Sequence, residues 1–181
     1  MLEEINVEQG SAEWLELRRT KITSTDAAVI LGVNPWKNIE KLKQEKLGVT
    51  QDYKNSAMQR GTDLEPIARK LYEDLYEIKL HPKVFVRDFC MASVDGICDN
   101  NQHLIEIKCP GAKEYAKALS GHVAPYYYAQ MQHQMYVLGL DLIYYFNFDG
   151  FFGHRIEVKR EEKYIGDMIE KEKEFYDALF W

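Results

Sequence analysis

Cysteine is scarce in this sequence, and long apolar runs are missing from it. The three cysteines, at positions 90, 98 and 109 of 181 residues, are odd in number and widely spaced, which excludes both a disulfide framework and a cluster held by four thiolates. We expect reduced, buried thiols and no structural zinc site. An apolar stretch such as residues 27–31 is far short of the ~20 residues that a membrane-spanning helix needs.

A targeting signal and an excess of basic residues are also lacking. Residues 1–6 have neither a basic start nor an apolar segment, so we expect an intracellular, cytoplasmic location. The 23 Lys and Arg against 29 Asp and Glu give a formal charge of −6, which argues against a protein that coats nucleic acid through a large basic face. A local basic groove remains compatible with this charge.

Apolar residues are abundant enough for one folded domain. Of the 181 residues, 46% are hydrophobic, and a chain of about 150 residues removes roughly two-thirds of its unfolded surface from water. We therefore expect residues 1–181 to form a single domain with a sizeable core.

Apolar periodicity divides this domain into helices and strands. Apolar residues repeat at helical spacing from Leu64 to Leu75. Pro66 has no N–H group, and proline is tolerated in the first turn of a helix, where N–H groups have no partner within the helix. We therefore expect this helix to start near Thr62 or Asp63. Further helices are expected at about residues 12–19, 24–31, 39–47, 125–138 and 162–179, and strands within 79–109 and at 142–148 and 152–158. The sum is an α/β fold with a central mixed β-sheet flanked by α-helices.

Two of the expected strands carry charged residues that need an explanation. Alternation along residues 104–109 places Glu106 and Lys108 on one face and Ile105 and Ile107 on the other. Asp95 lies eleven residues earlier, across a turn at residues 99–101. Charges near the centre of a sheet are costly unless they are paired or bound to a metal. The residues by themselves leave two interpretations open, an ordinary Glu106–Lys108 ion pair or a divalent-cation site for phosphodiester hydrolysis.

This segment and its surroundings resemble a known nuclease family. Asp95 followed by Glu106 and Lys108 resembles the PD-(D/E)XK signature, which is a weak motif by itself. Five blocks in the same order resemble phage lambda exonuclease and the YqaJ-like viral recombinase family over about residues 11–163. These blocks are Arg18 with Thr25, residues 60–66 (RGTDLEP), 93–96 (SVDG), 106–110 (EIKCP) and 129–132 (AQMQ).

The resemblance implies a restriction-endonuclease-like core and a catalytic centre. By it, Glu65, Asp95 and Glu106 would ligate Mg²⁺ or Mn²⁺, one or two ions per site, together with the backbone carbonyl of Ile107. Lys108 would be the catalytic lysine. Gln130 would help to position the attacking water or that lysine.

The resemblance also implies a pocket for the 5′ phosphate of the cut strand. Arg18, Thr25 and the adjacent Ser24 match that pocket, and Ser93 matches a phosphate-contacting serine. A planar guanidinium with several hydroxyl groups is a good phosphate receptor. Thr25 stands where serine is usual and Val94 where the motif has proline, and neither change removes a ligand.

The activity implied is a 5′-to-3′ exonuclease on double-stranded DNA ends that releases 5′ mononucleotides and leaves 3′ single strands for phage-type recombination. The implied partners are DNA ends, further copies of the chain in a closed ring, most simply a trimer, and a single-strand annealing protein, with no membrane. The gene would belong to a phage or prophage of a bacterial host. An endonuclease or nickase of the same fold, and a non-catalytic module that binds DNA ends, remain the alternatives.

Several site residues also have ordinary structural interpretations. Thr62 and Glu65 have the spacing of a helix capping box, in which Glu65 would bond only to the Thr62 N–H. Arg18 can be an ordinary surface arginine on a helix, and Gln130 can be a polar residue at the border of a buried helix face. His133 lacks a suitably spaced second histidine, which argues against its being a metal ligand.

Overall fold

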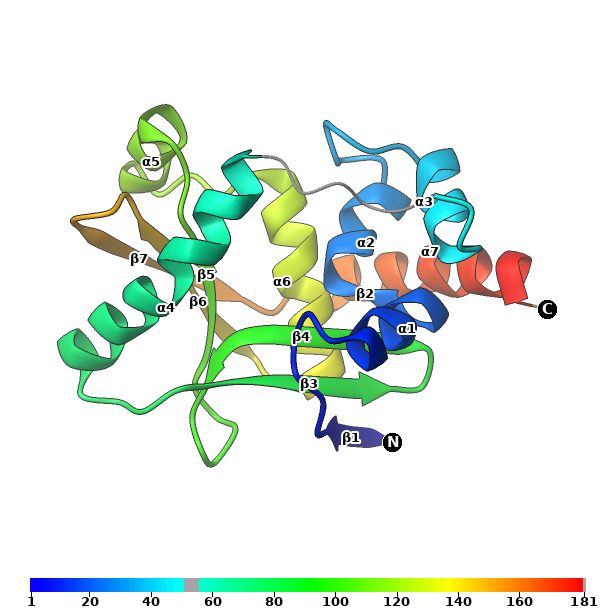
Figure 1. Ribbon diagram of the computed structural model, residues 1–181, viewed down its shortest axis with the longest axis horizontal. Helices are drawn as coiled ribbons and strands as arrows, with labels where there is room; N and C mark the ends of the chain where they lie inside the picture. Colours follow the sequence, from blue (N-terminus) through cyan, green and yellow to red (C-terminus); the bar gives the residue numbers. More distant parts are fainter. Residues whose placement is uncertain (51–55, 181) are drawn as a thin grey trace.

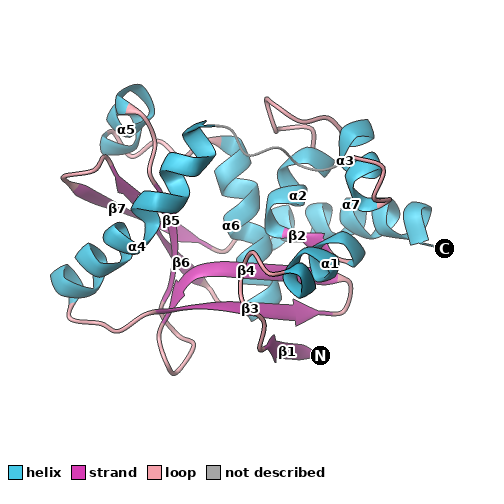
Figure 2. Cartoon of the chain, viewed as in Figure 1, coloured by secondary structure: helices cyan, strands magenta, loops and turns pink. Residues whose placement is uncertain are grey.

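A computed structural model describes residues 1–50 and 56–180. Helices and strands are interspersed along the chain in short runs of one kind (Figures 1 and 2). The helices are α1 (Ala12–Thr20), α2 (Ser24–Ile30), α3 (Ile39–Lys46), α4 (Ser56–Tyr76), α5 (Ala112–Leu119), α6 (Pro125–Leu138) and α7 (Glu162–Phe180). The strands are β1 (Leu2–Ile5), β2 (Ile22–Thr23), β3 (His81–Arg87), β4 (Cys90–Ile97), β5 (Leu104–Lys108), β6 (Leu142–Phe148) and β7 (Gly153–Lys159).

The strands form one mixed sheet, as expected. Its order is β1-β3-β4-β5-β6-β7, with β2 paired to β4 off this path. The β5–β6 and β2–β4 pairs are parallel, and the other pairs are antiparallel. The parallel β5–β6 pair requires a crossover, and α5 and α6 supply it.

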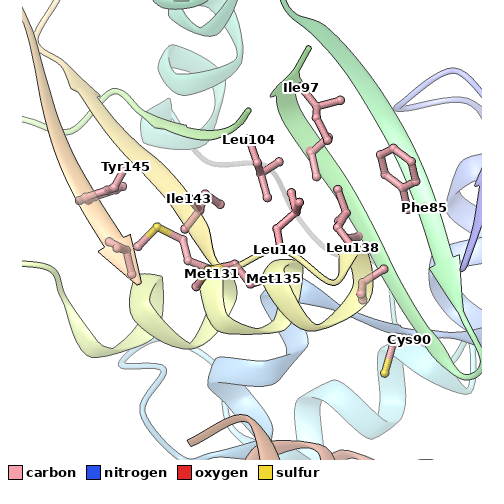
Figure 3. Packing of buried hydrophobic residues seen from close by; sticks show 14 residues of the cluster. Phe85, Cys90, Ile97, Leu104, Met131, Met135, Leu138, Leu140, Ile143 and Tyr145 are labelled. Atoms are coloured by element: carbon pink, nitrogen blue, oxygen red, sulfur yellow. The ribbon is translucent and has the colours of Figure 1, made fainter. Parts of the chain in front are cut away.

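Helices cover both faces of this sheet. Met131 and Met135 of α6 pack against Leu104 and Ile143 from the strands in the largest buried cluster (Figure 3). On the other face, Ala68 and other residues of α4 pack against the apolar side of β5 and β6. Helices α2 and α7 lie on α6 and form an outer layer. The central strands are therefore buried on both sides, and polar groups on them need partners.

Strands β4 and β5 stay paired over only two residue pairs, Gly96 with Ile105 and Ile97 with Leu104. A Cβ on Gly96 would come within 2.9 Å of Ile105 Cγ1, so glycine allows the two strands to approach there. Past Gly96 the pairing ends, and the two strands open toward Asp95 and Glu106. This opening lies between the helices of the two faces.

Helix α4 differs from its prediction at its start. It begins by Ser56, so Pro66 lies inside it and not in the first turn. Thr62 is an interior residue whose hydroxyl donates to the Met58 carbonyl at 3.1 Å. The capping box from Thr62 to Glu65 is therefore wrong, because a capping residue must precede the helix. Pro66 has no N–H group, so this helix lacks the hydrogen bond from position 66 to the carbonyl of Thr62.

Other details of the expected secondary structure also change. Residues 95 and 96 have the Asp-Gly sequence typical of turns but lie inside β4, and the β3–β4 reversal falls at Asp88, whose φ is +56°. Helix α5 and strands β1 and β2 were not expected. Glu172 of α7 is fully buried and does not face water. Among the described helices, none combines the length and the apolarity needed to cross a bilayer.

Candidate active site

Glu106 is the centre of the site and is fully buried on β5. Its Oε1 accepts a hydrogen bond from Gln130 Nε2 at 2.6 Å, and its Oε2 accepts one from Gln134 Nε2 at 2.6 Å. The two glutamines lie four residues apart on one face of α6, which points at the sheet. Charge-assisted bonds of this kind offset part of the cost of burying a carboxylate.

Lys108 pairs with Glu106 two residues along the same strand face. Its Nζ lies 2.5 Å from Glu106 Oε1 and 5.1 Å from the centre of the Tyr127 ring. Burial by itself would lower the pKa of Lys108, but the carboxylates of Glu106 and Asp95 outweigh it and raise that pKa. Lys108 is therefore a fixed ammonium group held between carboxylates and an aromatic face.

Asp95 reaches the opening between the strands from β4. Its Oδ2 accepts the backbone N–H of Ile107 at 2.7 Å, which replaces the missing ladder bond between β4 and β5. Burial raises the pKa of Asp95 well above its usual range, and the negative charges of Glu106 and Glu65 raise it further. Asp95 thus lies close to two other carboxylates without enough positive charge to balance them.

Glu65 comes from α4 on the opposite face of the sheet. Its Oε1 accepts from Arg69 Nη2 at 2.5 Å, and Arg69 Nε also donates to the Asp95 carbonyl at 2.6 Å. Burial raises the pKa of Glu65, Arg69 lowers it, and the charge of Glu106 raises it, with a net upward shift. Arg69 therefore links helix and strand at the site.

The three carboxylates are of the donor type that a divalent cation takes. Glu65, Asp95 and Glu106 supply hard oxygen donors, and hard cations such as Mg²⁺ bind through carboxylates, carbonyls and water. Burial raises the pKa values of Asp95 and Glu65, neighbouring carboxylates raise them further, and a bound cation would favour the charged forms. The carbonyl of Ile107 was expected to ligate the cation, and the N–H of the same residue donates to Asp95.

The residues expected to bind a terminal phosphate gather on α1, α2 and β4. Arg18 Nη2 donates to Thr25 Oγ1 at 3.3 Å, and the Arg18 guanidinium lies 4.5 Å from the Trp14 ring centre. Trp14 Nε1 donates to Ser93 Oγ at 2.8 Å. Arg18 is half-buried and held by contacts from two elements, so it is not a free surface arginine.

Ser24 precedes Thr25 in α2 and, unlike Thr25, is buried. Its side chain is buried, and within residues 1–50 and 56–180 its Oγ has no hydrogen-bond partner. A buried hydroxyl without a partner is rare and costs about 1–3 kcal/mol. Ser24 therefore retains an unused donor beside Thr25.

Sequence reasoning missed several residues of the site. These are Gln134, Tyr127, Arg69, Trp14 and Asn147. Gln134 was detectable, since it lies one helical turn beyond Gln130, but its bond to Glu106 needs the packing of α6 on β5. Asn147 lies opposite Lys108 in the β5–β6 register, is fully buried, and has neither amide atom bonded within the described residues. A buried amide in this state marks a polar position next to the lysine.

A second cluster on α6 lies apart from these carboxylates. His133 Nδ1 lies 2.9 Å from Glu172 Oε1, its Nε2 lies 3.2 Å from the Met91 carbonyl, and Cys90 Sγ lies 3.7 Å from Glu172 Oε2. Cys90, His133 and Glu172 offer donor atoms within 4.8 Å of one another, a spacing that can hold a metal ion. Burial, and then the charge of Glu172, raise the pKa of the Cys90 thiol, which keeps it protonated. Mutual hydrogen bonds account for this cluster. As expected, the cysteines are free thiols.

Comparisons with known proteins give a family for this chain. Residues 13–141 match the family described as the YqaJ-like viral recombinase domain. YqaJ of Bacillus subtilis (strain 168) is 28% identical over 184 residues, covering 95% of this chain and 57% of YqaJ. Protein R354 of Acanthamoeba polyphaga mimivirus is 28% identical over 152 residues, covering 74% of this chain and 28% of R354. The chain thus spans about half or less of these relatives.

Among solved structures, the chain is similar to LHK-Exo, an alkaline exonuclease from Laribacter hongkongensis. The TM-score is 0.77 at 26% identity, with 93% of this chain and 92% of that chain covered. The same protein in complex with dAMP gives a TM-score of 0.78 at the same identity and coverage. The expected mixed α/β fold is therefore that of exonuclease structures.

Proposed function

The chain belongs to the YqaJ-like viral recombinase domain family, and from that premise we propose that it is a metal-dependent exonuclease that degrades double-stranded DNA from 5′ ends. One observation carries the proposal. Glu65, Asp95 and Glu106 come from three different elements and lie close enough for the charges of Glu106 and Glu65 to raise the pKa of Asp95, beside a fixed Lys108 ammonium group. The similarity to LHK-Exo, an alkaline exonuclease, supports the same reaction class.

The residues divide the work of phosphodiester hydrolysis. A divalent cation, when bound, acts as a Lewis acid toward the scissile phosphate and lowers the pKa of water. Glu65, Asp95 and Glu106 would hold that cation, with the carbonyl of Ile107. Lys108 would orient the attacking water and stabilise the negative charge that develops on the phosphoryl oxygens. Gln130 and Gln134 keep Glu106 in place by donating to both of its oxygens.

Direction would follow from the pocket around Arg18. A 5′-terminal phosphate bound by Arg18, Thr25, Ser24 and Ser93 would set the scissile bond at a fixed distance from the 5′ end. The product would then be a 5′ mononucleotide, and the other strand would remain as a 3′ overhang for recombination. The existence of a complex between LHK-Exo and dAMP is in line with a mononucleotide product.

The wider setting follows from the same family. We propose that residues 1–181 act as one nuclease domain, that copies assemble into a trimeric ring around DNA, and that a single-strand annealing protein takes over the 3′ strand. The setting would be the cytoplasm of a bacterial host of a phage or prophage. A ring would retain DNA despite a net charge of −6.

The test is digestion of linear and covalently closed duplexes in Mg²⁺ or Mn²⁺. Linear duplexes carry a 5′ phosphate or a 5′ hydroxyl, and a label at either end of one strand reports direction. We expect mononucleotides from 5′-phosphorylated linear DNA, intact circles, and no reaction in EDTA. Cuts in closed circles would favour an endonuclease or nickase. DNA binding without released nucleotides in Mn²⁺ would favour a non-catalytic module that binds DNA ends.

Lys108→Met serves as the catalytic control in this assay. It removes the ammonium group and keeps the length of the side chain, so we expect at least a thousandfold slower release, about 4 kcal/mol of barrier lowering lost, with DNA binding retained. Lys163→Met removes an exposed lysine of α7 and should react at the parent rate. Equal rates for Lys108→Met and the parent would remove the lysine from the mechanism.

A further inference from the structure

A buried ion pair lies directly behind the pocket expected to bind the 5′ phosphate. Lys46 at the end of α3 and Asp26 of α2 are 4% and 5% exposed, and Lys46 Nζ lies 2.5 Å from Asp26 Oδ2. A buried pair of this kind contributes little to stability compared with apolar residues of the same size. Stability therefore does not explain this ion pair, and the other contacts of Lys46 and Asp26 indicate a different role.

Lys46 fixes the α1 side of the pocket. Its Nζ donates to the backbone carbonyl of Arg18 at 2.7 Å and to that of Lys21 at 2.6 Å. With Asp26, these contacts use all three N–H groups of the ammonium. Arg19 Nη1 in turn donates to the Lys46 carbonyl at 3.3 Å. The backbone that carries Arg18 is thus tied to α3 through one side chain.

Asp26 fixes the α2 side of the pocket. Its Oδ2 accepts from the Thr23 backbone N–H at 2.8 Å and from Thr23 Oγ1 at 2.7 Å. Thr23 Oγ1 lies 3.1 Å from Thr25 Oγ1, which accepts from Arg18. Since the Thr23 hydroxyl donates to Asp26, Thr25 must donate to Thr23. A continuous chain of hydrogen bonds therefore runs from Arg18 through Thr25 and Thr23 to Asp26.

Charge makes Lys46 necessary for an anion in this pocket. Burial by itself would raise the pKa of Asp26, but Lys46 and Arg18 outweigh it and lower that pKa, so the carboxylate is ionised. An unpaired carboxylate behind the pocket would repel a phosphate and attract the Arg18 guanidinium that the phosphate needs. Lys46 neutralises Asp26 and leaves the charge of Arg18 available.

We propose that Lys46 and Asp26 are a positioning pair that makes the pocket selective for 5′-phosphorylated DNA ends. Asp26 orients the hydroxyls of Thr23 and Thr25, and Lys46 cancels the charge of Asp26 while it holds the backbone of Arg18. The unused hydroxyl of Ser24 lies within the same segment. The inference rests on the proposed function, because it takes the occupant of this pocket to be a terminal phosphate.

The test compares binding of two duplexes that differ only in a 5′ phosphate or a 5′ hydroxyl. Fluorescence anisotropy in EDTA gives the ratio of the two dissociation constants without cleavage. We expect Lys46→Met to reduce the parent's preference for the phosphorylated end at least fivefold. Lys43→Met is the matched control, because Lys43 lies on the same helix as Lys46, has a partly exposed side chain and pairs with Glu40 at 3.8 Å. It should keep the parent's preference.

The double variant Asp26→Asn with Lys46→Met separates positioning from mere structural support. It removes both charges, so Arg18 is no longer drawn to an unpaired carboxylate. We expect it to recover preference relative to Lys46→Met, with both variants measured where they are folded. A role limited to tying the backbone of Arg18 predicts no recovery, because both variants lack the Lys46 bonds to the carbonyls of Arg18 and Lys21. Circular dichroism melting curves report folding of each variant. If Lys46→Met does not fold, the double variant is compared with the parent, and a preference equal to that of the parent refutes the pair.

Arg18→Ala distinguishes failure of the inference from failure of the proposed function. If Arg18→Ala loses the preference while Lys46→Met keeps it, the positioning pair is refuted and the pocket stands. If the double variant is no better than Lys46→Met, the pair is likewise refuted. If Arg18→Ala keeps the preference, the phosphate pocket itself is wrong and the inference falls with it.

Discussion

The carboxylates of the site are held at a cost in stability. Burial together with the charges of Glu106 and Glu65 raises the pKa of Asp95 in the folded chain, whereas its pKa in the unfolded chain is about 3.9. The folded state therefore binds protons more tightly at this group. Stability is highest below pH ~4 with respect to Asp95 and falls as the pH rises through the raised pKa.

Asp95→Asn should therefore stabilise the chain when no divalent cation is present. The amide oxygen can still accept the Ile107 N–H, and no negative charge at position 95 faces Glu106. In urea unfolding at pH 8 with EDTA, we expect a gain of about 1 kcal/mol in the free energy of unfolding. The gain should shrink as the pH is lowered toward 4, where Asp95 takes up a proton.

Mg²⁺ should reverse this order. It should raise the unfolding free energy of the parent more than that of Asp95→Asn, because it binds only the folded carboxylate cluster. Asp167→Asn, an exposed change on α7, should stay within about 0.5 kcal/mol of the parent throughout. A less stable Asp95→Asn at pH 8 in EDTA would contradict this account of the site.

At the scale of elements, the opening between β4 and β5 depends on Gly96. A Cβ there would lie 2.9 Å from Ile105 Cγ1 and 3.3 Å from Leu80 Cβ. Gly96→Ala must push β5 away, so we expect a loss of about 1–3 kcal/mol and weaker cation binding, as Asp95 and Glu106 separate. Thermal unfolding with and without Mg²⁺ measures both effects.

Gly166→Ala is the matched control for Gly96→Ala. Gly166 lies inside α7, where a Cβ would meet nothing within 4 Å. Alanine is the better helix former by about 1 kcal/mol, so this variant should be at least as stable as the parent, with unchanged Mg²⁺ stabilisation. Equal effects of the two substitutions would show that the approach of β4 to β5 is not special.

Elements were predictable where the pattern is local. Apolar spacing located α6 and α7 to within a residue or two, and Pro125 marked the start of α6. The prediction from Pro66 was wrong about the start of α4. Local chemistry favours a helix start near a proline, whereas the packing of Ala68 on the sheet keeps α4 helical on both sides of Pro66. Strand β1 is mostly exposed and has little apolar alternation that could reveal it.

At the scale of the whole molecule, the proposed ring predicts the mass of the protein in solution. Sedimentation equilibrium should give about three times the 21.2 kDa of one chain at micromolar concentration, because a closed ring is a defined oligomer and not a series of growing species. Degradation of long linear DNA should then be processive in the presence of excess competitor DNA. A monomer that degrades DNA processively would refute the ring.

The sequence by itself determined which side chains share a face of each strand. Glu106 and Lys108 lie on the α6 side, and Ile105 and Ile107 lie on the α4 side, because alternation in a strand is a property of the local backbone. Resemblance to a family supplied the remaining candidates.

Only the tertiary structure decided which of these residues meet. Glu65 reaches Asp95 and Glu106 because α4 packs across the opening between two strands, and Lys46 reaches Asp26 because α3 packs behind α2. Such contacts join residues 20 to 41 positions apart, so they depend on how helices pack on a sheet and not on any local pattern.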